Sequence, residues 1–209
     1  MFIRPNQFRN SKADVQIFYQ NSNWTKPPGV SQIYMMLIGG GGNAIVNGGG
    51  SGSVTVWYGA AQNVPNNLQL SISTGNFVST TISYIGTTTT VLLTANGANN
   101  STGATATTAG VFANTGFYQS VAGQNGATGS FNSSPTTFLS GGCTGVGRIG
   151  ANYGYSTTNN PGFFQLQPII VGCGSADDGV NTNVGGIGCG SGLFGSPVGG
   201  NGLILIASW

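Results

Sequence analysis

Pro27–Asn43 reads PPGVSQIYMMLIGGGGN and carries the clearest structural signal in the chain. Its centre, Ile33–Ile38, is an unbroken apolar run, with two prolines and a glycine before it and four glycines after it. A short apolar run bounded in this way is typical of a strand buried on both faces. We therefore predict a buried β-strand at Ile33–Ile38.

The same kind of segment recurs along the chain. Ser53–Tyr58 alternates, with Val54, Val56 and Tyr58 on one face, and Leu68–Ser73 alternates in the same way. No stretch combines helical periodicity with capping residues. Further strands are predicted at Thr80–Ile85, Val91–Thr94, Phe163–Val171 (an edge or bend because of Pro168) and Gly202–Ser208. The prediction is an all-β protein, an antiparallel β-sandwich of the jelly-roll type with long ordered glycine-rich loops.

Charged side chains are scarce. They make up 4% of the 209 residues, and there is no histidine and no glutamate, whereas about 25% is usual. A serine nucleophile therefore has no histidine to activate it. Asp177 and Asp178 are adjacent, so on an extended chain they point to opposite sides and make a poor acid–base pair. We expect no catalytic residues and no enzymatic activity.

Metal and cofactor sites are not expected either. The three cysteines are an odd number without metal-ligand spacing, and each lies among glycines, where it serves as a small packing residue. A calcium site at the turn Ser175–Gly179 stays open as an alternative. Two G-x-G-x-x-G matches, at Gly145–Gly150 and Gly190–Gly195, are expected by chance in a chain with 38 glycines. The cysteines are Cys143, Cys173 and Cys189.

The basic residues gather at the N-terminus. Four of the five lie within the first 26 positions, among aromatic residues. We predict an arm or first strand over residues 1–23, ahead of a domain at 24–209. A basic arm can bind nucleic acid, but charges interspersed with apolar anchors favour a strap that docks on another protein. The predicted contact residues of the arm are Phe2, Arg4, Phe8, Arg9, Lys12, Phe18 and Tyr19, with Ile17 as a further anchor.

Residues 96–160 are rich in Asn, Ser, Thr, Gly and Ala. We interpret this stretch as a long loop, which in a compact domain is usually functional. Glycines recur every third residue there and again at Gly199 and Gly202, which suits either stacked polyglycine segments or ordinary tight turns. Candidate ligand or receptor contacts are Tyr153, Tyr155, Asn159 and Asn160.

Four segments, taken in order, resemble a known family. Trp24–Asn43, Gly48–Ser73, Ser83–Ala98 and Gly199–Trp209 are similar to units of glycine-rich domains in tail fibres and other virion proteins of phages and large DNA viruses. The resemblance implies a β-sandwich whose glycine-rich excursions pack as loops at one end. It also implies a structural or host-recognition role in a virion, without catalytic residues.

The leading expectation is a non-enzymatic virion structural protein. It would be a minor capsid, cementing or surface component that docks on the viral shell through apolar and backbone contacts. Its partners would be the major capsid protein or neighbouring minor proteins, and copies of itself in a homo-oligomer, with a trimer as the candidate state. Neither a membrane nor nucleic acid is an expected partner. The other expectation is a receptor-binding adhesin at a fibre or spike tip, which recognises host glycan or protein through its glycine-rich loops.

Overall fold

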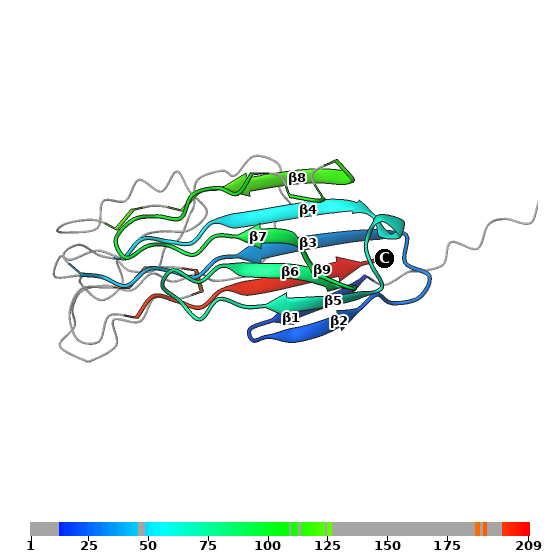
Figure 1. Ribbon diagram of the computed structural model, residues 1–209, viewed down its shortest axis with the longest axis horizontal. Coiled ribbons are helices and arrows are strands. Elements are labelled where there is room, and N and C mark those ends of the chain that lie inside the picture. The colour runs from blue at the N-terminus through cyan, green and yellow to red at the C-terminus, as the bar shows by residue number, and fades with distance from the viewer. Residues whose placement is uncertain are drawn as a thin grey trace, which may run out of the picture.

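The described part of the chain folds into two antiparallel β-sheets with almost no helix. The computed structural model describes residues 13–45, 49–108, 110–112, 114–123, 125–126, 187–188, 190–191 and 198–209. The strands of both sheets run along the long axis of Figure 1. The only helix within the described residues is the short 3-10 turn η1 (Ala61–Asn63). The all-β prediction is thereby confirmed.

The first sheet has five strands in the order β1-β9-β3-β4-β8. They are β1 (Asp14–Phe18), β9 (Leu203–Ser208), β3 (Gln32–Ile38), β4 (Val54–Ala60) and β8 (Gly116–Val121). The predicted buried strand is therefore the central strand β3, paired with β4 on one side and with the C-terminal strand β9 on the other. When both faces of a sheet are covered, its central strand needs apolar residues at successive positions. This explains the unbroken apolar run at Ile33–Ile38.

The second sheet has four strands in the order β2-β5-β6-β7. They are β2 (Ser22–Thr25), β5 (Asn67–Ser71), β6 (Thr80–Ile85) and β7 (Thr89–Ala95). The alternation of buried apolar residues is clearest in β5, where Leu68 and Leu70 are buried and their neighbours are not, whereas in β7 both Leu92 and Leu93 are buried. The alternation means that this sheet buries only one face, the one against the first sheet.

The core between the sheets is centred on Trp57 of β4. Its ring stacks on Phe112 with centroids 4.9 Å apart, and its Nε1–H donates to the carbonyl of Phe112 at 3.1 Å. Alternate residues of β3 (Ile33, Met35, Leu37) face the same core, together with Leu70 and Ile82 of the second sheet and others. This layer fixes the two sheets face to face.

A second apolar layer lies on the outer face of the five-stranded sheet. The other residues of β3, Tyr34, Met36 and Ile38, belong to it, with Leu205 of β9 and Val56 of β4. All of these side chains are buried. The five-stranded sheet is thus apolar on both faces, unlike the four-stranded one.

Beyond the strand ends, glycine-rich segments pack against one another. Gly39–Gly42, directly after β3, forms backbone hydrogen bonds with four other stretches of chain, at residues 50–53, 98, 191 and 200. Gly39 N–H donates to Ser53, Gly41 to Gly200 and Gly42 to Gly50, while the carbonyl of Gly40 accepts from Ala98. A Cβ on Gly39 would overlap the carbonyl oxygen of Asn96, and one on Gly42 that of Asn100. These segments lie at the left-hand end of Figure 1, opposite the C-terminus.

The sequence left two explanations open for the glycines, stacking and tight turns. Positive φ angles, which a tight turn can require, occur among the described glycines only at Gly29, Gly75 and Gly188. Gly199 and Gly202, from the predicted period of three, instead meet backbone atoms of Gly41 and Ile38 at distances that leave no room for a Cβ. At these two positions the close approach of backbones accounts for glycine.

Two strands were not predicted. β8 lies inside residues 96–160, which we interpreted as loop, so that interpretation is wrong for Gly116–Val121. β2 crosses the proposed boundary between residues 23 and 24 and pairs with β5. The other predicted strands are found within a few residues of their expected ends, except Phe163–Val171, which lies outside the described residues.

Candidate interaction surface

Among the described strands, four lie at the edges of the two sheets, and edges are the natural places for contact with another chain. They are β1 and β8 in the five-stranded sheet and β2 and β7 in the four-stranded sheet. An edge strand presents unpaired N–H and C=O groups to any extended segment that reaches it. What covers each edge therefore decides where a partner can bind.

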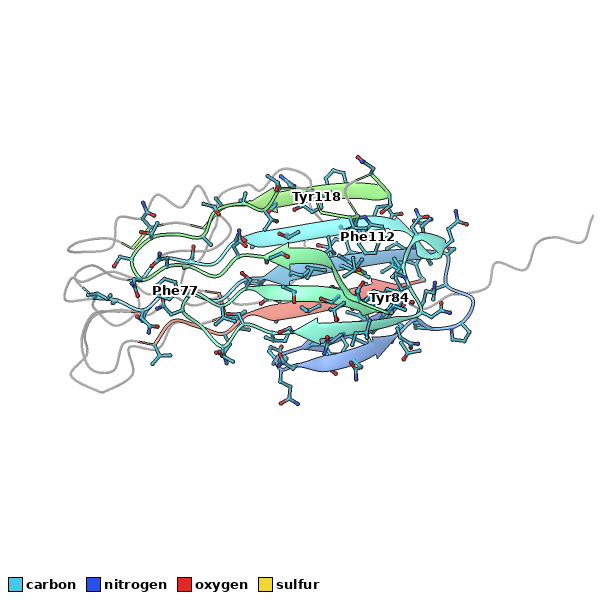
Figure 2. The ribbon with its side chains drawn as sticks, viewed as in Figure 1. Phe77, Tyr84, Phe112 and Tyr118 are labelled. Carbon is cyan, nitrogen blue, oxygen red and sulfur yellow. The ribbon has the colours of Figure 1, made fainter. Side chains whose placement is uncertain are left out.

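The side of the sandwich between β7 and β8 is closed by the chain itself. Thr107, in the segment between these strands, donates from Oγ1 to the carbonyl of Thr94 on β7 at 3.0 Å. Its hydroxyl also lies 2.7 Å from the Tyr118 hydroxyl of β8, and its N–H donates to Ser120 Oγ at 2.9 Å. Tyr118 is labelled on β8 in Figure 2. This segment bridges the two edges.

Thr55 extends this hydroxyl cluster into the sheet. Its Oγ1 donates to the Thr94 carbonyl at 2.7 Å and lies 3.0 Å from Ser120 Oγ and 3.1 Å from Thr107 Oγ1. A groove of about 410 Å³ follows the same side, lined by Val91, Thr107, Tyr118 and neighbours. The hydroxyls are satisfied by one another and by backbone, so the cluster joins the two sheets and offers no reactive group.

A shallower groove lies beside β2 and β5. It has a volume of about 330 Å³ and is lined by Asn21–Asn23 and Gln69–Ser71, whose side chains are amides and hydroxyls apart from that of Leu70. The Asn21 side-chain carbonyl already accepts from the N–H of Ile72 at 2.7 Å. This surface is polar and uncharged.

The edge strand β1 exposes two apolar side chains, with a third just beyond it, whereas β7 and β8 each expose one, Val91 and Phe117. Val15 is 48% exposed, Ile17 42% and Tyr19, just beyond the strand, 59%. Val15 pairs with Ala207 and Ile17 with Leu205, so both lie on the outer face of the sheet, next to its buried apolar layer. β1 therefore forms an exposed rim of that layer.

The backbone of β1 also has hydrogen-bonding groups that no described residue pairs with. Gln32 and Trp209 exchange both backbone bonds, at 3.0 and 3.1 Å, so the N–H and C=O of Trp209 point from β9 toward β3. Because direction alternates along a strand, Ile206 points toward β1, where it pairs with Gln16. Val15 and Ile17 consequently direct their N–H and C=O groups outward, away from β9.

Of the predicted arm residues, the structure describes Ile17, Phe18 and Tyr19. Phe18 packs against the protein's own core, whereas Ile17 and Tyr19 are exposed. Sequence reasoning did not select Val15, although the alternation in DVQIF, with Val15 and Ile17 two residues apart, was a signal that could have found it. The remaining arm residues (Phe2, Arg4, Phe8, Arg9, Lys12), the loop candidates (Tyr153, Tyr155, Asn159, Asn160), the three cysteines and Asp177–Asp178 lie outside the described residues.

The described charges are few and locally placed. Lys26 donates from Nζ to the carbonyls of Ala61 and Val64 at 2.9 and 2.7 Å, which ties η1 to the connection between β2 and β3. Asp14 accepts from the Gln16 side chain. Burial raises the pKa of Tyr34, on the outer face of β3, to about 12.

Two searches of the described part of the chain were negative. It contains no group of three or more His, Cys, Asp or Glu side chains placed to hold a metal ion. Among the same residues, no helix has the length and apolarity needed to cross a membrane.

Comparison with known proteins identifies no relative. No protein-family model matches the chain, and neither does any curated protein or solved structure.

Proposed function

We propose that this chain is a non-enzymatic structural protein of a virion. In this proposal it is a minor capsid, cementing or surface component, and it docks on the shell, or on neighbouring minor proteins, through apolar side chains and backbone hydrogen bonds. The sandwich takes the jelly-roll form, and glycine-rich loops extend from its glycine-packed end.

The observation that carries the proposal is the exposed apolar rim on β1. Val15 and Ile17 are exposed on β1, and Tyr19 directly after it, and no described residue pairs with the outward backbone groups of this strand. Exposed contiguous apolar surface on an otherwise polar protein marks an interaction site. With a net charge of +2 over 209 residues, there is little electrostatic repulsion to keep neighbouring molecules apart.

The class of assembly is supported by the resemblance of four ordered segments to glycine-rich virion domains. In the fold, Trp24–Asn43 supplies β3 and the glycine run after it, and Gly199–Trp209 supplies the paired strand β9. Segments far apart in the chain therefore form one structural unit. The proposal rests on the occurrence of all four segments, in this order, in one chain.

Quantitative mass spectrometry on purified particles tests the virion assignment. We expect the chain in constant ratio to the major shell protein, and retained after a wash in about 1 M salt, where the Debye length is only about 3 Å. Absence from particles would contradict the assignment. Release by salt alone would contradict docking through apolar and backbone contacts.

The contribution of the arm is tested by deleting residues 1–12, which leaves β1 and both sheets intact. We expect the truncated protein to fold but to incorporate poorly into particles. Normal incorporation would show that Phe2, Arg4, Phe8, Arg9 and Lys12 do not form the strap.

A receptor-binding adhesin is the second candidate, favoured by one observation at the glycine-packed end. Phe77 is 58% exposed and has φ of 64°, a left-handed conformation that is costly for a bulky residue. Its N–H donates to Ala98 at 2.8 Å, which holds it in place. Figure 2 shows Phe77 at the end of the sandwich away from Phe112 and Tyr84.

Binding of the purified protein to host cells distinguishes this candidate. If the tip recognises a receptor, Phe77→Ala should weaken cell binding, while Ile85→Ala, at a similarly exposed position on β6, should not. Equal binding by the two variants would mean that Phe77 does not contact a receptor, and the adhesin would lose its support.

A further inference from the structure

We propose that two copies of this chain pair through their β1 strands, antiparallel and about a two-fold axis at Gln16, to form one continuous sheet across the dimer. The proposal goes beyond the proposed function, since it assigns the backbone edge of β1 to a second copy and fixes the register of that contact. The exposed side chains of Val15 and Ile17 stay on the outer face, where the shell can contact them.

Strand β1 is the least protected edge among the described strands. The β7 and β8 edges are bridged by Thr107, whose contacts occupy the Thr94 carbonyl and the Ser120 hydroxyl. β2 has four residues, with Trp24 buried. β1 has neither proline nor lysine nor a bulge, the usual devices that keep edge strands from pairing.

The register of the contact follows from which residues of β1 point outward. The outward-pointing residues of β1 are Val15 and Ile17, and in an antiparallel pair outward residues must face outward residues. An axis at Gln16 places Val15 opposite Ile17 of the second copy, and Ile17 opposite Val15. Each such pair exchanges both of its backbone hydrogen bonds, so every free N–H and C=O within the strand finds a partner.

The side chains and charges of β1 are compatible with this register. Val15 and Ile17 of both copies lie on the outer face, where they extend the apolar layer formed by Leu205 and Met36 across the dimer. Cross-strand pairs of β-branched residues stabilise a sheet. Asp14, the only charged residue of β1, faces Phe18 of the second copy, so no like charges are opposed.

A disulfide tests the register directly. Gln16 faces Gln16 of the second copy as a non-hydrogen-bonded pair, with Cα atoms about 4.5 Å apart, which is within the range of a disulfide. Gln16→Cys should therefore cross-link two chains under mild oxidation, and the linked peptide should be residue 16 to residue 16 by mass spectrometry. Peptide mapping separates this bond from any formed by Cys143, Cys173 or Cys189.

Val15→Cys is the matched control, since in this register two copies of position 15 are two residues out of line. It should not cross-link to itself, whereas a mixture of Val15→Cys and Ile17→Cys proteins should cross-link. Self-linking of Val15→Cys would overturn the proposed register. Failure of Gln16→Cys to cross-link would overturn the pairing.

The oligomeric state supplies the second test. The unmodified full chain should sediment at twice its chain mass over a concentration series, and Ile17→Lys should be monomeric, because it places two ammonium groups beside apolar side chains at the axis. Val91→Lys, on edge strand β7 at a site 47% exposed, should remain a dimer. Circular dichroism and melting temperature confirm that both variants fold.

Three outcomes would overturn the proposal: a monomer at all concentrations, a trimer, or a dimer that Ile17→Lys leaves intact. The first would leave the β1 edge to a different protein. None of these results bears on whether the chain is found in particles, so failure here is distinguishable from failure of the proposed function.

Discussion

The strand-built body of the molecule and its glycine-packed end are held together by opposite means. In the body, large side chains fill the space between backbones, as Trp57 and Phe112 do between the two sheets. At the glycine-packed end, backbones touch directly, and Gly42 has the carbonyl of Asn100 where its side chain would be. Side chains stabilise the first region and would disrupt the second.

The two regions also differ in what their stability depends on. Burial of apolar surface, worth roughly 25 cal/mol per Å², dominates in the body. The glycine-packed end offers little apolar surface, so it depends on backbone hydrogen bonds such as Gly42 to Gly50 at 2.7 Å and Gly41 to Gly200 at 2.8 Å. Each is worth about 1 kcal/mol net. The end is therefore sensitive to shape and tolerant of low hydrophobicity.

The largest expected effect is loss of the central side chain of the body. Trp57→Ala should lower the free energy of unfolding by about 3–5 kcal/mol, because it leaves a cavity beside Phe112 and removes the stacked ring. Denaturant unfolding followed by circular dichroism measures this. Trp57→Phe, which keeps an aromatic ring, should lose distinctly less. A loss below about 1 kcal/mol for Trp57→Ala would mean that the body is not held in this way.

At the glycine-packed end, adding a single carbon atom to one residue should be enough to destabilise the protein. Gly42→Ala should cost about 1–3 kcal/mol, since the new Cβ overlaps a backbone carbonyl that is fixed by its own hydrogen bonds. The control is Gly86→Ala, an exposed position where the nearest atom belongs to the ring of Tyr84 at 3.1 Å, which can move aside. It should change stability by no more than about 0.5 kcal/mol. Equal effects at the two sites would contradict close backbone packing at Gly42.

The sequence predicted the body better than it predicted the rest. Ile33–Ile38 and Gly202–Ser208 are apolar at nearly every position, and such runs need no knowledge of the partner strand. β8 (GFYQSV) was missed because none of its residues is fully buried, so its pattern resembles the polar sequence around it. It becomes a strand through pairing with β4.

Contacts between residues far apart in the sequence explain why the packing of the glycine-packed end and the outer face of β1 could not be predicted. Gly42 meets Gly50, but also Ser191, whose N–H donates to its carbonyl from far along the chain. No local pattern reports such a contact, which is why stacking and turns could not be separated. Likewise, the arm region was predicted as a contact, but only the register with β9 shows that Val15 and Ile17 share the outer face.

The last expected effect concerns the outer face of the body and is confined to high pH. The Tyr34 side chain is buried, and its pKa is raised to about 12, from about 10 in the unfolded chain. Between these two values the unfolded chain releases the phenol proton and the folded protein keeps it. The group's contribution to stability is therefore complete below pH 10 and is lost as the pH rises through 10 toward 12, by an amount on the order of 2 kcal/mol.

Denaturant unfolding at a series of pH values from 8 to 12 tests this, with Tyr34→Phe as the control. The wild-type protein should lose stability across this range more steeply than Tyr34→Phe, because phenylalanine cannot ionise. Parallel curves for the two proteins would mean that Tyr34 is hydrated, and so that the outer layer of the five-stranded sheet is not dry. In that case only one face of that sheet would be held by buried side chains, and the contrast with the glycine-packed end would apply to the inner core alone.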